Sequence, residues 1–153
     1  MSASSLSPVR RALPDDVGSI EGALAEAGPT VVALSGGVDS SVMALLLRRA
    51  LGDRAFAATL AGPAVSRREI DRATEVARWI GISHEVVEAD PLAVEGYRTN
   101  PSNRCYFCRS VEGQAILRWA GPRGIRSFVD GIHRDDLTDD RPGIRALEEV
   151  GFR

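Results

Sequence analysis

The chain has 153 residues, of which 44% are hydrophobic, and a formal net charge of −2. These values are ordinary for one compact globular domain, and the slightly acidic balance disfavours nucleic acid as the main partner. No run of about 18 apolar residues is present, and the first thirteen residues lack the apolar segment of a signal peptide. We therefore expect a cytoplasmic protein without a membrane-spanning segment.

All 19 basic residues are arginines, because the sequence contains no lysine. This excludes mechanisms that need a lysine amine, among them the Walker A phosphate loop and Schiff-base chemistry. The two cysteines, Cys105 and Cys108, form a Cys-x-x-Cys pair. In a cytoplasmic chain this pair indicates free thiols rather than a structural disulfide.

Apolar periodicity divides the chain into a flexible tail at 1–13 and one domain at 14–153. Within the domain, helical and extended patterns alternate. In chain order they predict a helix from Pro14 to a stop at Gly28, a strand at 30–34, a helix at 39–51, a strand at 55–60, a helix between Ser66 and Gly81, a strand at 85–88, a helix at 105–121, a strand at 127–130 and a helix at 144–150.

Side-chain spacing gives more detail for several of these helices. Ser66 and Glu69 have the spacing of a capping box. Trp79 and Trp119 occupy helical positions and are expected in the core. The other apolar residues at helical spacing, predicted to share a buried face, are Val17, Ile20 and Leu24 of the first helix, Val42, Leu45, Leu46 and Ala50 of the second, and Ile70, Ala73, Ala77 and Ile80 of the third.

Strands that alternate with helices are typical of right-handed β-α-β crossovers and a parallel sheet. The predicted fold is therefore α/β, a Rossmann-like three-layer α/β/α arrangement with helices on both faces of the sheet. In such folds ligands bind beyond the carboxyl ends of the strands.

The segment SGGVDSS at 35–41 follows the first predicted strand and opens the next helix. Gly36 and Gly37 leave backbone N–H groups uncovered, the serines add hydroxyl donors, and a helix N-terminus favours an anion. This spacing indicates a phosphate cradle. For the two glycines alone, a turn capped by Asp39 is the alternative.

Ser-Gly-Gly-x-Asp-Ser after a strand resembles the PP-loop of the ATP pyrophosphatases, the adenine nucleotide alpha hydrolase-like (HUP) superfamily. These enzymes cut ATP between its α and β phosphates, and the resemblance implies ATP and Mg²⁺ as cofactors and AMP transfer as the reaction. It also implies Asp39 and Asp136 as magnesium ligands. The implied nucleotide contacts are Ala33, Ser35, Gly36, Gly37, Val38, Asp39, Ser40, Ser41, Thr59, Asp130, Gly131 and Arg141.

Further segments resemble the LarE family of ATP-dependent sacrificial sulfur transferases, which act in nickel-pincer cofactor biosynthesis. They are GISHEVVE at 81–88, NPSNRCYFCR at 100–109 and VDGIHRDDLTDDRPG at 129–143. The resemblance implies adenylylation of a carboxylate on a small nucleotide-like substrate, a pyridinium mononucleotide in family members, followed by sulfur insertion. The implied catalytic residues are Asp39, Arg104, Cys105 and Cys108.

The chain departs from the LarE pattern in two places. Ile132 and His133 stand where the family has Thr-Asn, so hydrogen bonds from that pair are lost or replaced. No cysteine follows Cys108, whereas family members continue into a C-terminal region with sulfur-donating cysteines. We expect that region to be absent, through truncation or because a donor protein or missing-domain partner supplies the sulfur; the alternative donors are the two cysteines themselves.

Each candidate residue also has a plainer structural interpretation. The thiolates of Cys105 and Cys108 would be favoured at a helix N-terminus, suiting sulfur chemistry or half of a metal site, but one thiol packed in the core is the alternative. His84 is expected to be structural, whereas His133 is a candidate ligand contact. The acidic run at 135–140 is either a magnesium site or a solvated loop.

Other functions stay open at this stage. One class keeps the superfamily but changes the acceptor, as in an amide-forming ligase of the NAD synthetase kind or a tRNA-thiolating enzyme. Another is a non-catalytic adenine-nucleotide-binding module or subunit. We also expect a homo-oligomer, because an absent region would leave an apolar patch for a partner subunit to cover.

Overall fold

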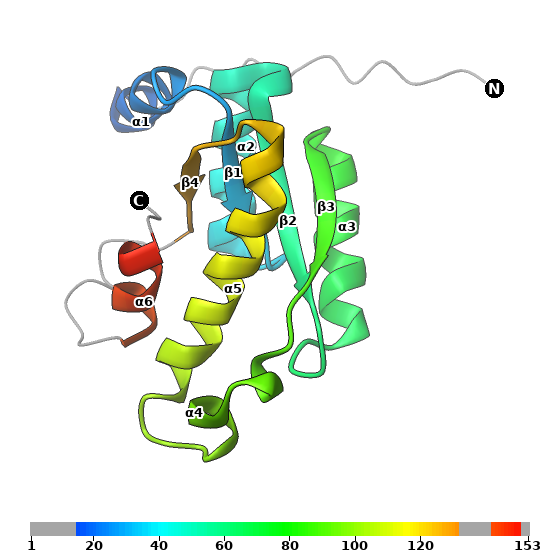
Figure 1. Cartoon of the computed structure of the whole chain (residues 1–153). Helices are drawn as coiled ribbons and strands as arrows, with labels where there is room; N and C mark the ends of the chain where they lie inside the picture. The colour runs from blue at the N-terminus through cyan, green and yellow to red at the C-terminus, as the bar shows by residue number, and fades with distance from the viewer. Residues whose placement is uncertain (1–14, 132–141, 151–153) are drawn as a thin grey trace.

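The computed structural model describes residues 15–131 and 142–150 (Figure 1). At its centre lies a four-stranded sheet in the order β3-β2-β1-β4, in which every neighbouring pair is parallel. The predicted α/β fold with a parallel sheet is therefore confirmed. The strands are β1 (Thr30–Ala33), β2 (Ala55–Ala61), β3 (Ser83–Glu88) and β4 (Ser127–Val129).

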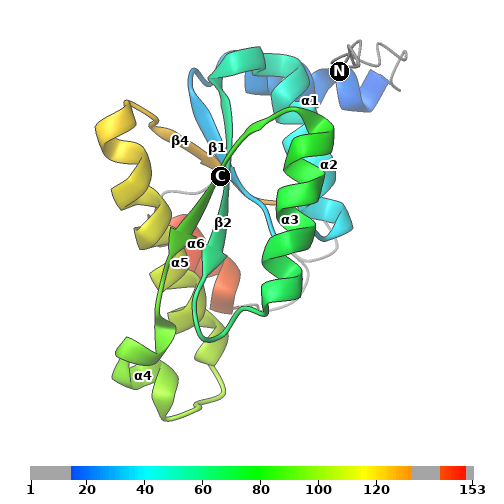
Figure 2. The same ribbon diagram turned by 90° about the vertical axis from the view of Figure 1, so that its right-hand side faces the viewer.

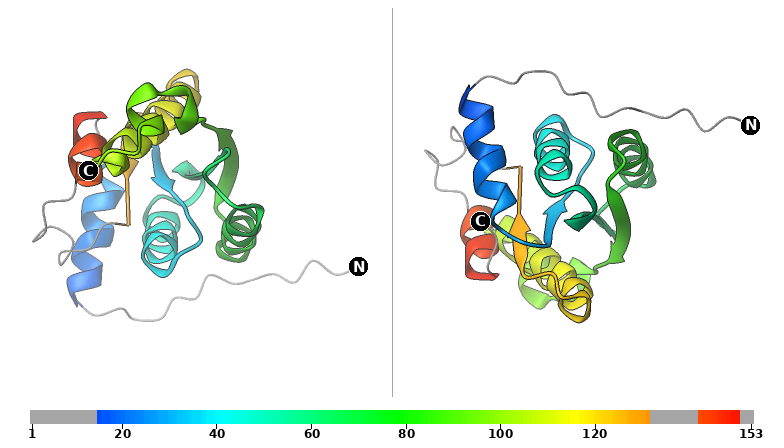
Figure 3. Two further views of the ribbon diagram at one scale, coloured as in Figure 1. Left: turned by 90° about the horizontal axis from the view of Figure 1, so that it is seen from below. Right: turned by 90° about the horizontal axis from the view of Figure 1, so that it is seen from above.

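Helices cover both faces of the sheet, which confirms the predicted three layers (Figures 2 and 3). None of the helices in the described part of the chain has the length and apolar character that a membrane crossing requires. One face carries α1 (Asp15–Ala25), α2 (Val38–Leu51) and α3 (Arg67–Ile80), and the other carries α5 (Arg104–Ala120) and α6 (Pro142–Val150). The connections contain η1 (Gly52–Arg54), η2 (Pro91–Ala93), α4 (Glu95–Arg98) and η3 (Gly121–Arg123).

The central strand β1 shows how side-chain alternation builds the two cores. Val32 and, just after the strand, Leu34 pack in the core that contains α1, α2 and α3. Val31 and Ala33 pack in the core that contains α5 and α6. Burial on both faces explains why this segment is a continuous apolar run rather than an alternating one.

The strand order reverses beside β1. From β1 the chain passes through α2 to β2 and through α3 to β3, and α5 then carries it back across the sheet to β4 on the other side of β1. The carboxyl ends of β1 and β4 therefore form a switch point, the place where open parallel sheets bind ligands. In Figure 1, α4 and the first turns of α5 extend beyond the carboxyl ends of the strands.

The predicted core face of α2 is partly wrong. Val42 and Leu45 are 51% and 36% exposed, and the helix instead buries Ala44, Leu47 and Leu51 together with the correctly predicted Leu46. Apolar residues occur on nearly every side of this helix, so periodicity alone could not select the face that meets the sheet.

Two other core predictions also fail. Ile20 is 42% exposed, because α1 turns its neighbour Glu21 toward α2, where the carboxylate pairs with Arg49 at 2.9 Å. Trp79 is 72% exposed on α3. The prediction for Trp119 is confirmed, since it packs edge-on against Phe56 with ring centroids 6.4 Å apart.

The capping box of α3 is present as predicted, and it offers a test of what holds this helix. The N–H of Glu69 donates to Ser66 Oγ at 3.3 Å, and the N–H of Ser66 donates to Glu69 Oε2 at 2.9 Å. We expect Ser66→Ala to lower the free energy of unfolding by about 1 kcal/mol, measured by urea denaturation. Ser83→Ala, at an exposed strand start, is the control; an equal loss there would contradict the capping role.

Candidate active site

The glycine loop at 35–41 runs from the carboxyl end of β1 into the first turn of α2. Gly36 has a φ of +77°, which favours glycine, and a Cβ on it would lie 2.9 Å from the backbone nitrogen of Ala73 in α3. Glycine is therefore required at this position for two reasons, the left-handed turn and the close approach of α3.

Serine hydroxyls hold the loop from inside. The N–H of Ser35 donates to Ser40 Oγ at 3.2 Å, and Ser40 Oγ donates to the carbonyl of Gly37 at 3.3 Å. Ser41 Oγ donates to the same carbonyl at 2.6 Å. Because Ser40 is only 7% exposed, we assign its hydroxyl to the shape of the loop.

The N-terminus of α2 has the features of an anion site. Gly37 is its N-cap and has no side chain with which to cap the helix; its own N–H donates to Ser35 Oγ at 3.3 Å. The backbone N–H groups of a first turn and the helix dipole both favour a negatively charged ligand. A phosphate group therefore fits the donor set at this end of α2.

The carboxyl end of β4 meets the same turn of α2. A Cβ on Gly131 would lie 2.5 Å from the backbone nitrogen of Ser40 and 2.7 Å from the carbonyl carbon of Asp39, so only glycine fits without a shift of backbone. The N–H of Gly131 donates to Asp130 Oδ1 at 2.6 Å. The structure thus brings together two predicted segments, the glycine loop and Asp130-Gly131.

Behind the loop, Thr59 and His84 form a short polar chain. Thr59 is 3% exposed, and its hydroxyl donates to the carbonyl of Leu34 at 2.7 Å. His84 Nε2 lies 2.7 Å from the same hydroxyl oxygen, which must accept, so this nitrogen carries the proton. Burial lowers the pKa of His84, with the neighbouring Glu85 opposing. The histidine is hydrogen-bonded in a structural position, as expected.

A cluster of charged side chains lies beside Asp130. Arg109 Nη1 pairs with Glu112 Oε2 at 2.8 Å and lies 3.6 Å from Asp130 Oδ2. The side chains of Glu112 and Asp130 are only 15% and 10% exposed. Burial raises the pKa of Glu112, whereas for Arg109 the two carboxylates outweigh burial and raise its pKa.

The cysteine pair and Arg104 lie in the first turns of α5. Arg104 is exposed and donates to Asn100 Oδ1 at 2.9 Å rather than to the glycine loop. Cys105 is exposed and Cys108 is half-buried; both thiols are free. Burial raises the pKa of Cys108, with the Glu112 carboxylate adding to the effect. For Cys108, burial therefore opposes the thiolate that a helix N-terminus favours, which agrees with the alternative of a packed thiol.

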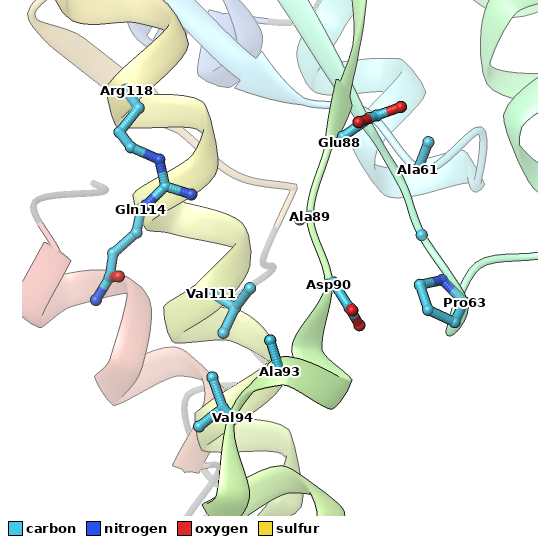
Figure 4. Close-up of a pocket in the computed structure, with 11 residues that line it drawn as sticks. Ala61, Pro63, Glu88, Ala89, Asp90, Ala93, Val94, Val111, Gln114 and Arg118 are labelled. Carbon is cyan, nitrogen blue, oxygen red and sulfur yellow. The ribbon is translucent and has the colours of Figure 1, made fainter.

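A groove of about 630 Å³ opens at the carboxyl ends of β2 and β3 (Figure 4). Gln114 and Arg118 of α5 line one side, and Glu88 and Asp90 line the other. The groove lies on the side of the sheet that α5 covers, and no residue of the glycine loop lines it.

The predicted metal ligands are only partly covered by the structure. Asp39 is exposed on the first turn of α2, where a carboxylate oxygen suits a hard cation such as Mg²⁺. Asp136, Arg141 and His133 lie outside the described residues. Within the described ranges, no group of three or more His, Cys, Asp or Glu side chains is arranged to hold a metal ion.

Sequence reasoning missed Arg109 and Glu112. Arg109 closes the cysteine-bearing segment, and Glu112 follows at i+3, a spacing that predicts an ion pair on one helix face. That signal is common on helix surfaces, and only the path of β4 shows that a third charge, Asp130, completes the cluster.

The contact between Gly131 and α2 predicts a steric effect. We expect Gly131→Ala to destabilise the fold by about 1–3 kcal/mol, because the added methyl group must displace backbone. Gly121→Ala is the control, since a Cβ there meets no atom within 4 Å. Urea unfolding of both variants measures the difference, and equal stability would contradict the close approach.

The role of Thr59 can be tested with an isosteric change. Thr59→Val removes the hydroxyl and leaves the Leu34 carbonyl and His84 Nε2–H without their partner, so we expect a loss of about 1–3 kcal/mol in unfolding free energy. Thr74→Val is the matched control, because that hydroxyl only bonds the Ile70 carbonyl of its own helix. Thermal and urea denaturation compare the two, and a smaller loss in Thr59→Val would argue against the buried chain.

Two curated proteins are similar to this chain in sequence. An uncharacterized protein of Synechocystis is 42% identical over 123 residues, covering 80% of this chain and 46% of its own length. Pyridinium-3,5-bisthiocarboxylic acid mononucleotide synthase of Lactiplantibacillus plantarum is 26% identical over 132 residues, covering 86% of this chain and 48% of that protein. The chain thus spans about half the length of these curated relatives.

Among solved structures, glutamine-dependent NAD+ synthetase from Acinetobacter baumannii in complex with ADP has a TM-score of 0.62 at 17% identity, covering 76% of this chain and 24% of that one. This similarity supports the fold. The asparagine synthase family matches residues 17–99, which is more than half of the 153-residue chain. The chain therefore belongs to the asparagine synthase family of PP-loop ATP pyrophosphatase domains.

Proposed function

We propose that this chain binds ATP at the glycine loop and transfers AMP to a carboxylate of a small nucleotide-like substrate, preparing it for sulfur insertion as in the LarE family. The observation that carries the proposal is the N-terminus of α2, where a glycine N-cap follows the left-handed Gly36 and where the backbone of Gly131 approaches closely. Family membership and the similarity to a bisthiocarboxylic acid mononucleotide synthase support it.

In this proposal the loop from Ser35 to Ser41 holds the phosphates that leave as pyrophosphate. A carboxylate oxygen of the acceptor attacks the α phosphorus, the bond from that phosphorus to the bridging oxygen breaks, and pyrophosphate departs with the electron pair. Backbone N–H groups and the dipole of α2 would stabilise the charge that develops there. Asp39 would hold Mg²⁺, which supplies further neutralisation of the phosphates.

The remaining predicted contacts follow from their places at the carboxyl edge. Ala33, Val38 and Thr59 would border the part of the site that holds the nucleoside. The Thr59 hydroxyl is hydrogen-bonded to the Leu34 carbonyl, so Thr59 would contact the nucleoside through its backbone. Asp130 and Gly131 would border the phosphates. Arg141 and Asp136 are proposed as further anion and metal contacts.

The acceptor and sulfur source belong to the same proposal. Arg104, exposed at the start of α5, is available to an acceptor carboxylate. Cys105 is the more accessible of the two thiols, and we propose that it, or a cysteine of a donor protein or missing-domain partner, supplies the sulfur. Its thiolate would attack the adenylylated carbonyl carbon and form a thioester, while AMP leaves with the electron pair of the broken C–O bond. Loss of the Cα proton of that cysteine would then break its Cβ–S bond, which releases the thiocarboxylate with the electron pair on sulfur and leaves dehydroalanine. The chain spans about half the length of its curated relatives. The activity of a whole protein of that length is therefore part of what is proposed here.

The test uses the purified chain with magnesium, α-labelled ATP and a dicarboxylated pyridinium mononucleotide, with AMP, ADP and acceptor-AMP separated by chromatography. We expect acceptor-dependent AMP and pyrophosphate, reduced about a hundredfold in Asp39→Asn. Asp53→Asn is the matched control, since this exposed aspartate lies beyond the opposite end of α2 and pairs with Arg48 at 2.8 Å.

The alternative outcomes separate the competing functions. Turnover only with ammonia and a carboxylate would indicate an amide-forming ligase. ATP binding without turnover for any acceptor would indicate a binding module and contradict AMP transfer. Release of ADP rather than AMP would contradict cleavage between the α and β phosphates.

A further inference from the structure

Arg109 joins three parts of the carboxyl edge that are far apart in the sequence. Its guanidinium pairs with Glu112 at 2.8 Å within α5 and lies 3.6 Å from Asp130 at the end of β4. Its stem is covered by α6, where a Cβ on Gly143 would lie 3.1 Å from Arg109 Cγ. Neither Arg109 nor Glu112 takes part in the proposed chemistry.

We propose that Arg109, oriented by Glu112, is a positioning residue that fixes Asp130 and, through it, holds the backbone of Gly131 against the phosphate-binding turn of α2. The inference rests on the proposed function, since it concerns the same site.

Charge and burial explain why Asp130 needs this partner. Its Oδ2 is buried and has no hydrogen-bond partner within the described residues, so the guanidinium 3.6 Å away is the positive charge that compensates it. Glu112 contacts the same Nη1 atom and thereby limits where the guanidinium can lie. Without Arg109, the poorly exposed carboxylates of Glu112 and Asp130 would repel each other with no positive charge beside them.

Asp130 passes this constraint to the phosphate site. Its other oxygen, Oδ1, accepts the N–H of Gly131 at 2.6 Å. The backbone of Gly131 in turn lies so close to Ser40 that a single methyl group would not fit. A change in the Asp130 carboxylate therefore moves Gly131 relative to the first turn of α2, and small displacements of such a turn alter how well it holds a ligand.

The experiment compares Arg109→Met with Arg49→Met in the full chain. Arg49 is a matched control, because it also forms a partly buried ion pair, with Glu21 at 2.9 Å, but between α1 and α2 and away from the carboxyl edge. Calorimetry measures the binding of magnesium α,β-methylene-ATP, and urea unfolding measures stability. Amide chemical shifts of Ser40 and the hydrogen exchange of the Gly131 amide report the position of the turn without any ligand.

We expect Arg109→Met to weaken nucleotide binding about fivefold or more, to shift the Ser40 amide and to speed exchange at Gly131. Arg109→Lys should restore part of each effect, because it keeps the charge but not the forked geometry. Arg49→Met should lower stability without changing these readouts. If Arg109→Met does not fold, Arg109→Lys is compared with the wild type. We then expect weaker nucleotide binding and a shifted Ser40 amide in Arg109→Lys, and wild-type values for both would overturn the positioning role.

The two proposals can fail separately. If the wild-type chain does not bind the nucleotide but the Ser40 and Gly131 amides still respond to Arg109→Met, the proposed function fails and the positioning role stands. If the wild type binds and Arg109→Met loses stability while affinity and both amides stay as in Arg49→Met, Arg109 is merely structural and the positioning role is overturned.

Discussion

The contact between the backbone of Gly131 and the first turn of α2 closes the switch point of the sheet. β1 and β4 lie side by side, but the chain between them runs through two other strands and three long helices before it returns. Hydrogen bonds between β1 and β4 align the carboxyl ends of the two strands. Because Gly131 has no side chain, the chain after β4 can lie against the first turn of α2, the helix that follows β1. The shape of the candidate site depends on this approach.

Polar groups at this edge divide into two sets. Ser35, Ser40 and Ser41 satisfy one another and the Gly37 carbonyl, so the hydroxyls shape the loop from within. The first turn of α2, which follows the glycine N-cap Gly37, is the part whose electrostatics suit an anion. A loop built in this way needs no lysine, which agrees with a sequence whose cationic side chains are all arginine.

The fold was largely predictable, because alternating helical and extended patterns with glycine stops define parallel β-α-β units without knowledge of packing. The capping box was predictable for the same reason, since it depends on two residues three positions apart. The buried face of α2 was not, because a helix with apolar residues on several sides leaves that choice to tertiary contacts, and Val42 and Leu45 are exposed. Trp79 was misplaced for another reason: it lies outside the stripe of Ile70, Ala73, Ala77 and Ile80 in α3, so helical spacing puts it on the exposed side. At the site, the glycine loop could be located from its letters. Arg109 could not, because its significance depends on Asp130, which only the folding of β4 brings near.

One tryptophan is exposed to solvent and the other is packed against the core, so their fluorescence responds differently to unfolding. Trp79 is 72% exposed on α3, whereas Trp119 packs against Phe56 with the guanidinium of Arg123 4.7 Å from its ring centroid. Emission from the first is already that of an indole in water, so unfolding changes it little. The red shift on denaturation therefore reports the layer of α5, the helix that carries the cysteines, Arg109 and one wall of the groove.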